Sequence, residues 1–205
     1  AYAEALFNAK RRTQARELAE AALAKNPKEP LAAVVIAELE LLASDLDGAA
    51  SALKPALVLN DPHPQVLGLL AKIRMQQSRW ADAVDLYEMG IRKLQADKTY
   101  LPQSDEWLKG LAAAYIKLNA TDRLGRVLEM LAGLDGDNAT VRKKLAQLAV
   151  EAGDVATAKK WAKEALFIDV RDAELHTIMA QAYDAEGDTK RANRERRMAN
   201  ELGAP

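Results

Sequence analysis

The chain has 205 residues, of which 49% are hydrophobic and 29% charged, and its formal net charge is −1. This composition is typical of a soluble globular or repeat protein. The near-zero net charge disfavours binding of nucleic acid or acidic membranes by the molecule as a whole. No run approaches the roughly 18 apolar residues that cross a bilayer, so membrane insertion is not predicted. The absence of cysteine excludes disulfides and thiolate metal sites and leaves the compartment, cytoplasm or periplasm, open.

The clearest local pattern lies between residues 140 and 169, where two short amphipathic helices are predicted back to back. In the first, apolar residues recur at helical spacing from Leu145 to Ala152. Gly153 then breaks the pattern, because glycine reaches backbone angles that other residues avoid. The second helix repeats the spacing from Ala158 to Leu166. Neither helix could bury its apolar face alone, so the pair needs neighbours.

The same pair of helices recurs along the whole chain. Small residues form columns with a constant spacing, apart from one longer step in the middle of the chain, and leucine replaces them in the fourth repeat of the second and third columns. A large apolar residue precedes each member of the first column. The first column is Ala3, Ala37, Ala71, Ala112, Ala146 and Ala180; the second is Ala15, Ala49, Ala83, Leu124, Ala158 and Ala192; the third is Ala22, Ala56, Gly90, Leu131, Ala165 and Ala199.

A period of about 34 residues with two helices per unit resembles the tetratricopeptide repeat (TPR) family. The resemblance covers essentially the whole chain and implies an all-α, right-handed superhelix of about twelve helices in six antiparallel pairs. It predicts a single helical repeat domain over residues 1–205, with seven additional residues inserted within 95–104. The six repeats are expected at about 1–28, 30–61, 64–95, 105–136, 139–170 and 173–203.

The first repeat lacks the start of its leading helix, and the chain begins inside a helical pattern. We therefore interpret the sequence as a piece of a longer protein. Tyr2, Leu6 and Leu31 indicate an apolar N-terminal end. Upstream repeats or a second copy of the chain, as in a homodimer, are expected to cover that end.

Catalytic and metal-binding patterns are scarce. The two histidines, His63 and His176, lie more than two repeats apart, whereas a nucleophile needs an adjacent base and zinc ligands come in close pairs. No glycine-rich phosphate loop is present. His63 is predicted to be a loop residue and His176 a helix-face residue. We expect no enzyme activity, no metal and no cofactor.

A basic cluster near the C-terminus invites comparison with nucleic-acid-binding surfaces. No aromatic residue for stacking bases lies nearby, and Glu195 and Glu201 interrupt the charge. The cluster is therefore interpreted as the polar outer face of a terminal repeat, and no nucleic-acid partner is predicted. Its members are Lys190, Arg191, Arg194, Arg196 and Arg197.

The family resemblance implies a concave surface lined by the first helix of each repeat. The register assigns to that surface Val34 and Glu38 in the second repeat and Gln65 and Leu69 in the third. Trp107 is predicted to pack between helices, with the edge of the groove as the alternative. The predicted peptide-binding residues are Lys72, Gln76, Lys109, Lys117, Lys143, Lys144, Gln147 and Gln181.

The lysines of that set are suited to a peptide carboxylate or to acidic side chains, although they could equally only solvate an open face. The family's carboxylate clamp of lysine and asparagine is not reproduced, because the nearest match is Lys143 with Gln147. The expected function is a protein–protein interaction scaffold that binds an extended peptide or a partner helix in the groove. The alternative is a non-catalytic regulatory or assembly region of a larger enzyme whose catalytic domain lies upstream.

Overall fold

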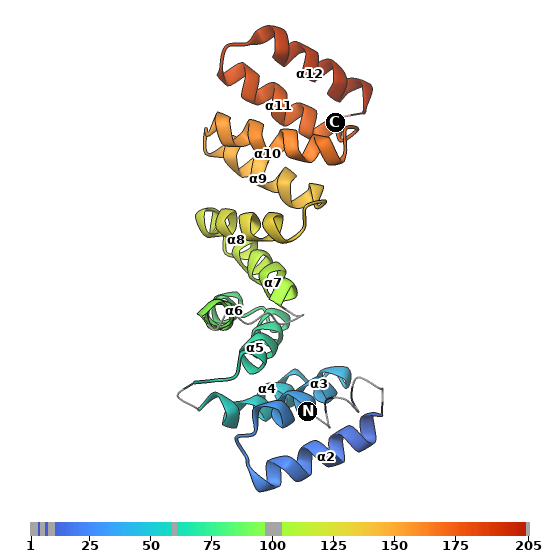
Figure 1. Ribbon diagram of the computed structural model, residues 1–205, viewed down its shortest axis with the longest axis vertical. Coiled ribbons are helices and arrows are strands. Elements are labelled where there is room, and N and C mark those ends of the chain that lie inside the picture. The colour runs from blue at the N-terminus through green and yellow to red at the C-terminus, as the bar shows by residue number, and fades with distance from the viewer. Residues whose placement is uncertain (1–3, 5–6, 8–10, 59–60, 97–103, 204–205) are drawn as a thin grey trace. The chain divides into compact units, whose positions relative to one another are not determined.

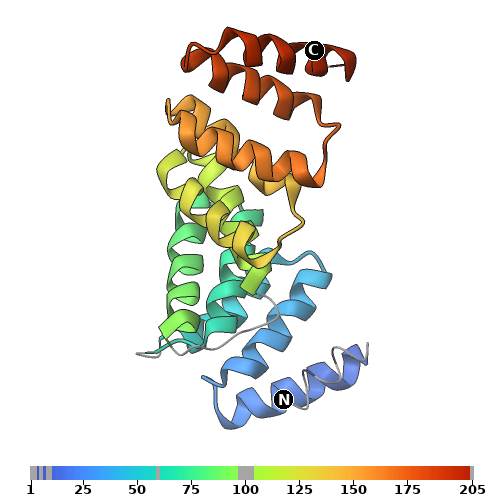
Figure 2. The ribbon, with the colours of Figure 1, turned by 45° about the horizontal axis from the view of Figure 1, so that its top comes forward.

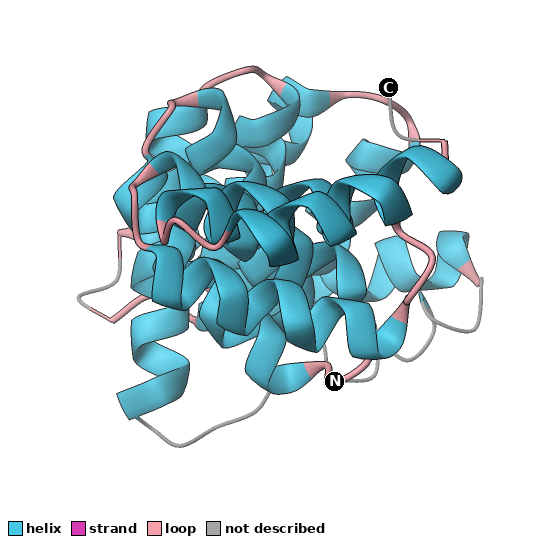
Figure 3. Ribbon diagram, turned by 90° about the horizontal axis from the view of Figure 1, so that it is seen from above, coloured by secondary structure: helices cyan, strands magenta, loops and turns pink. Residues whose placement is uncertain are grey.

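The structure is a computed structural model that describes residues 4, 7, 11–58, 61–96 and 104–203. These residues form eleven helices and contain no strand, which confirms the all-α prediction (Figure 3). None of the described helices has the length and apolar character needed to span a membrane. The chain divides into two compact units, Ala1–Asn119 and Ala120–Pro205. The predicted single domain over residues 1–205 remains a prediction.

Within each unit, neighbouring helices pack against each other, and most form antiparallel pairs joined by short turns (Figure 1). Most of the predicted insertion, residues 97–103, lies outside the described residues. The first unit holds α2 (Arg12–Lys25), α3 (Pro30–Leu42), α4 (Leu46–Leu57), α5 (Pro64–Gln76), α6 (Trp80–Ala96) and α7 (Ser104–Lys117). The second unit holds α8 (Thr121–Leu134), α9 (Ala139–Glu151), α10 (Val155–Ile168), α11 (Ala173–Ala185) and α12 (Thr189–Glu201).

One backbone conformation recurs in the turn after each first helix from the second repeat onward. Ser44, Ser78, Asn119, Gly153 and Gly187 all have positive φ, between 53° and 77°. They recur at the spacing of the apolar columns, including the longer step between the third and fourth repeats. A left-handed residue after a helix is the usual C-terminal cap, and in this chain two serines and one asparagine adopt it besides glycine. The turn therefore repeats even where the sequence does not supply glycine.

Acidic residues begin several of the second helices. The carboxylates of Asp45, Asp154 and Asp188 accept hydrogen bonds from the backbone N–H groups of Gly48, Thr157 and Arg191, at 2.8, 3.0 and 3.0 Å. Each carboxylate satisfies one of the donors left free in the first helical turn. Turn and cap together reverse the chain within a few residues, which is what sets the two helices side by side.

The core of the first unit lies on both sides of α3. One side of the helix packs with α2 through Ala32, Val35 and Leu39. The opposite side, with Ala33 and Ala37, packs with α4 and α5. This explains why the sequence of α3 is apolar nearly all round its axis. The small residues allow the neighbouring helices to approach closely.

In the second unit, α11 lies between the α9–α10 pair and α12 (Figure 2). Seven residues of α11 are buried, whereas α12 buries only Ala192 and Ala199. The rest of α12 is largely charged and exposed. Gly203, with φ +84°, follows the end of the helix.

Candidate functional site

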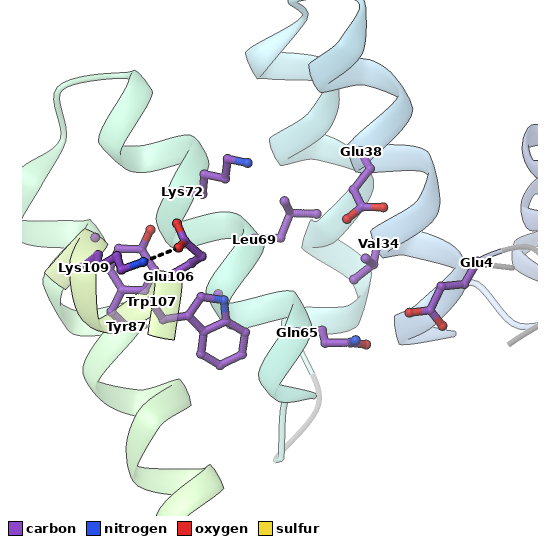
Figure 4. A pocket seen from close by; sticks show the side chains of 12 residues that line it. Glu4, Val34, Glu38, Gln65, Leu69, Lys72, Tyr87, Glu106, Trp107 and Lys109 are labelled. Carbon is purple, nitrogen blue, oxygen red and sulfur yellow. Dashed lines mark hydrogen bonds and ion pairs between the residues drawn. The ribbon is translucent and has the colours of Figure 1, made fainter. Parts of the chain in front are cut away.

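A groove of about 510 Å³ opens in the first unit along the first helices of consecutive repeats. Val34 and Glu38 point from α3 toward Leu69 on α5, and the Trp107 indole lies on the α7 side (Figure 4). Tyr87 contributes from α6. The described residues that line the groove are Glu4, Val34, Glu38, Gln65, Gly68, Leu69, Lys72, Tyr87, Glu106, Trp107, Lys109 and Gly110.

Glycines in the helices make room for the aromatic residues of the groove. A Cβ atom on Gly68 would lie only 2.1 Å from Cε2 of Trp107, so the indole rests directly on the backbone of α5. On α7, a Cβ atom on Gly110 would lie 2.6 Å from the Tyr87 hydroxyl. Trp107 is only 7% exposed although it lines the groove. The two rings are thus held in fixed positions and form a rigid apolar wall.

The charges at the two ends of the groove differ in how they are satisfied. Lys109 forms a salt bridge of 2.8 Å with Glu106 at the α7 end. At the α3 end, burial first and the Glu4 carboxylate second raise the pKa of Glu38, and the positive charge of Lys72 opposes the shift. Within the described part of the chain, neither a hydrogen bond nor a salt bridge engages the Glu38 carboxylate. The Glu38 charge is therefore less well compensated than the paired charges of Lys109 and Glu106.

The Tyr87 hydroxyl is not an acid at physiological pH. Burial, and to a smaller extent the Glu106 carboxylate, raise the pKa of Tyr87 to about 12. The side chain therefore presents a neutral ring and a neutral hydroxyl to the groove.

Both histidines have structural roles. The His63 Nδ1 atom accepts a hydrogen bond of 3.3 Å from the N–H of Gln65 and thereby caps α5. Burial lowers the pKa of His63, although Glu4 and Glu29 act in the opposite direction, and the neutral ring is the form that can accept this bond. His176, predicted to be a helix-face residue, lies on α11 and faces the protein interior. It is 6% exposed, and its ring nitrogens contact the Glu195 carboxylate at 2.7 Å and the Val170 carbonyl at 3.0 Å.

Comparison with solved structures finds close matches in fold. YrrB, described as a TPR protein with an unusual peptide-binding site, aligns over 92% of this chain and 93% of its own, with a TM-score of 0.70 and 14% identity. The chain has the tetratricopeptide-repeat fold. A MamA structure aligns over 86% of this chain and 91% of its own, with a TM-score of 0.64 and 19% identity. A second MamA structure covers 82% and 94%, with a TM-score of 0.59 and 19% identity. No protein-family model and no curated protein matches the sequence.

In this tetratricopeptide-repeat chain, the groove gathers only part of the predicted peptide-binding set. Lys72 and Lys109 line it, together with Val34, Glu38, Gln65 and Leu69, which the register had assigned to the same surface. The other six predicted residues do not line this groove, and their role in binding remains a prediction. Gln76, Lys117 and Gln181 are exposed, and Lys143, Lys144 and Gln147 are half-buried.

Two of these residues connect α9 to α11. Lys143 contacts Asp172 at 2.8 Å and Glu174 at 3.1 Å, and Gln147 donates to Glu174. The hydrogen bond to Asp172 is the main reason that the pKa of Lys143 is raised. Burial alone would raise the pKa of Asp172. The hydrogen bonds from Lys143 and from two backbone N–H groups outweigh burial and lower it. Both groups are therefore ionised at neutral pH and bound to each other.

Several lining residues were missed at the sequence level. Tyr87 belongs to a second helix, whereas the predicted surface comprised first helices alone. Glu4 and Glu106 carry no pattern that separates them from solvated carboxylates. A usable signal existed in Gly68 and Gly110, because a glycine inside a helical pattern often marks a close approach. Trp107 occupies both of the locations predicted for it, because it packs between helices and also lines the groove.

Proposed function

We propose that the chain is a protein-interaction scaffold that binds an extended peptide segment of a partner protein in the groove along α3, α5 and α7. The observation that carries the proposal is the groove itself. It combines the apolar side chains of Leu69 and Trp107 with polar groups such as Gln65 and Glu38, and such a combination is usual in a ligand-binding cleft. Its length over three successive first helices suits an extended segment.

Two further points support this function. The two histidines are engaged in contacts within the fold, so the described residues offer no histidine free to act as a base. YrrB, which shares the fold at 14% identity, is described as having a peptide-binding site. We therefore assign no catalytic step to the groove.

The test compares two partly buried leucines that pack against the same core. Leu69 lines the groove, whereas Leu86 on α6 does not. Peptides are selected from a random dodecapeptide phage library on the unaltered protein and resynthesised. Their affinities are then measured for the Leu69→Ser and Leu86→Ser variants, with thermal denaturation of both.

We expect Leu69→Ser to weaken binding at least tenfold, because about 1.4 kcal/mol is lost with the apolar contact. Leu86→Ser should bind as the unaltered protein does. Selection of no peptide at all, or equal affinities for both variants, would overturn the proposed function.

A further inference from the structure

The charges lining the groove do not balance. Among the described lining residues, three carboxylates, of Glu4, Glu38 and Glu106, face two ammonium groups, of Lys72 and Lys109, which leaves these side chains with a formal charge of −1. Glu106 and Lys109 neutralise each other at 2.8 Å. Within the described part of the chain, the excess negative charge therefore lies at the α3 end, where Lys72 is the cation that opposes Glu4 and Glu38.

The Glu38 carboxylate is suited to bind a positive group supplied by a ligand. It is half-buried, and no hydrogen bond or ion pair among the described residues engages it. Removing a carboxylate from water costs free energy unless a partner replaces the water. The neighbouring carboxylate of Glu4 increases this cost. A positive group supplied by a ligand would offset both effects.

Two of the predicted lysines have the opposite character. Lys109 already binds Glu106, and Lys143 in the second unit already binds Asp172 and Glu174. An acidic ligand would have to compete with these carboxylates. The other lysine of the groove, Lys72, is exposed, and its charge already acts on Glu38. The groove thus favours a basic ligand, although its lysines taken from the sequence had suggested an acidic one.

The apolar surface lies beside this acidic end. Val34 precedes Glu38 by one helical turn on α3, so the two side chains are neighbours on one face of the helix. Leu69 faces both of them from α5 (Figure 4). The methylene groups of a lysine or arginine can lie along such apolar surface while the charged end reaches a carboxylate. The rigid Trp107 ring offers the adjoining position for an apolar side chain.

We propose that the groove selects a peptide with a lysine or arginine, whose charge lies against Glu38 and Glu4, next to an apolar side chain that packs on Leu69 and Trp107. This inference rests on the proposed function, since it names the chemistry of the ligand in the same groove.

The experiment sequences the pools selected from the same random library on the unaltered protein, on Glu38→Gln and on Glu40→Gln. Glu40→Gln is the matched control, because that half-buried carboxylate lies on the same helix, does not line the groove and is paired with Arg16 at 2.8 Å. We expect lysine or arginine beside an apolar residue to be enriched on the unaltered protein and on Glu40→Gln. The enrichment should disappear on Glu38→Gln, whose folding is checked by thermal denaturation.

A double-mutant cycle with one selected peptide isolates the contact. Replacing its basic residue by norleucine should weaken binding to the unaltered protein about tenfold, the usual size for a hydrogen bond to a charged group. The same replacement should change affinity for Glu38→Gln by less than about twofold, because the partner charge is then absent.

The two proposals fail in different ways. If peptides bind and are sensitive to Leu69→Ser, but show no basic enrichment or tolerate norleucine equally in both proteins, the ligand chemistry is wrong and the peptide groove stands. Enrichment of acidic residues would likewise overturn the basic ligand and favour Lys72 and Lys109. If no peptide depends on Leu69, both proposals fail.

Discussion

Arg142 and His176 occupy the same position in two consecutive repeats, where the preceding repeats have Leu108 and Leu67. Both are buried and bind backbone carbonyl groups of the preceding segment. Arg142 donates to the carbonyls of Ala132 at 3.1 Å, Asp135 at 3.0 Å and Asn138 at 3.3 Å, and to the Glu164 carboxylate at 3.3 Å. It thereby satisfies carbonyl groups at and just after the C-terminal end of α8.

Replacing Arg142 by methionine is expected to lower the free energy of unfolding by about 2–3 kcal/mol. The apolar stem would be kept, but the Ala132 carbonyl would lose its buried donor, and hydrogen bonds to charged groups contribute about 1.5–3 kcal/mol. Urea denaturation measures the change. The control is Lys144→Met, a little further along the same helix and only half-buried, which should cost less than about 0.5 kcal/mol. Similar losses in both variants would contradict the structural role of Arg142.

At this scale the sequence predicts which face a residue belongs to and little about its partners. The register correctly assigned Glu38 and Leu69 to the groove-lining surface. It could not reveal that Lys143 binds Asp172, because that partner lies 29 residues away and the approach of α9 to α11 has no signature in either helix. Whether a charged side chain is free to bind a ligand depends on its tertiary contacts, and the spacing of residues in the sequence does not reveal those contacts.

Close approach of helices in the first unit depends on positions without a Cβ atom. Gly68 on α5 and Gly90 on α6 both face the Trp107 ring. A Cβ atom would lie 2.1 Å from the ring if it were added to Gly68, and 3.3 Å from the ring if it were added to Gly90. Gly90 stands in a column that is mostly alanine, so the third repeat has a smaller residue where the large ring enters. The two glycines thus make room for the same tryptophan ring.

Gly68→Ala should destabilise the protein by about 1–3 kcal/mol, because the ring or α5 must move to admit the methyl group. Gly125→Ala is the matched control, since nothing lies within 4 Å of its Cβ site on α8. That variant should gain about 0.5–1 kcal/mol from the higher helix propensity of alanine. Thermal and urea denaturation of the two variants give opposite signs if the packing is as described. A gain in both would contradict it.

Some of the left-handed turn residues could be predicted from the sequence, and others could not. The breaks at Gly153 and Gly187 are visible as glycines, and both have the left-handed conformation. Ser44 and Ser78 adopt the same conformation without any compositional sign, because the repeat geometry imposes it on whichever residue stands there. Helix bounds and pairing were therefore easier to predict from periodicity than from local turn residues.

At the scale of the whole molecule, the stacking of helix pairs was predictable because the repeat period records it directly. The division into two compact units was not predicted, since the apolar columns run on through the fourth repeat without interruption. Periodicity reports that each repeat has a face to bury. It does not report how strongly successive repeats hold together.

Burial within each unit predicts a gradient of local stability. In the second unit α11 buries seven residues and α12 two, and in the first unit α3 buries six and α2 two. Amide hydrogens of α12 and α2 should therefore exchange faster than those of α11 and α3, because helices with few buried contacts open more easily. Hydrogen exchange followed by mass spectrometry measures the protection of each helix. Equal protection along each unit would contradict this gradient.

The placement of Trp107 gives the groove an optical reporter. Its indole is sheltered from water yet lies at the groove surface, so an occupant that displaces the remaining solvent or brings a charge near the ring alters its emission. Trp80 and Trp161 do not line the groove and supply a constant background. Titrations can consequently be read from intrinsic fluorescence, without attaching a dye to either molecule.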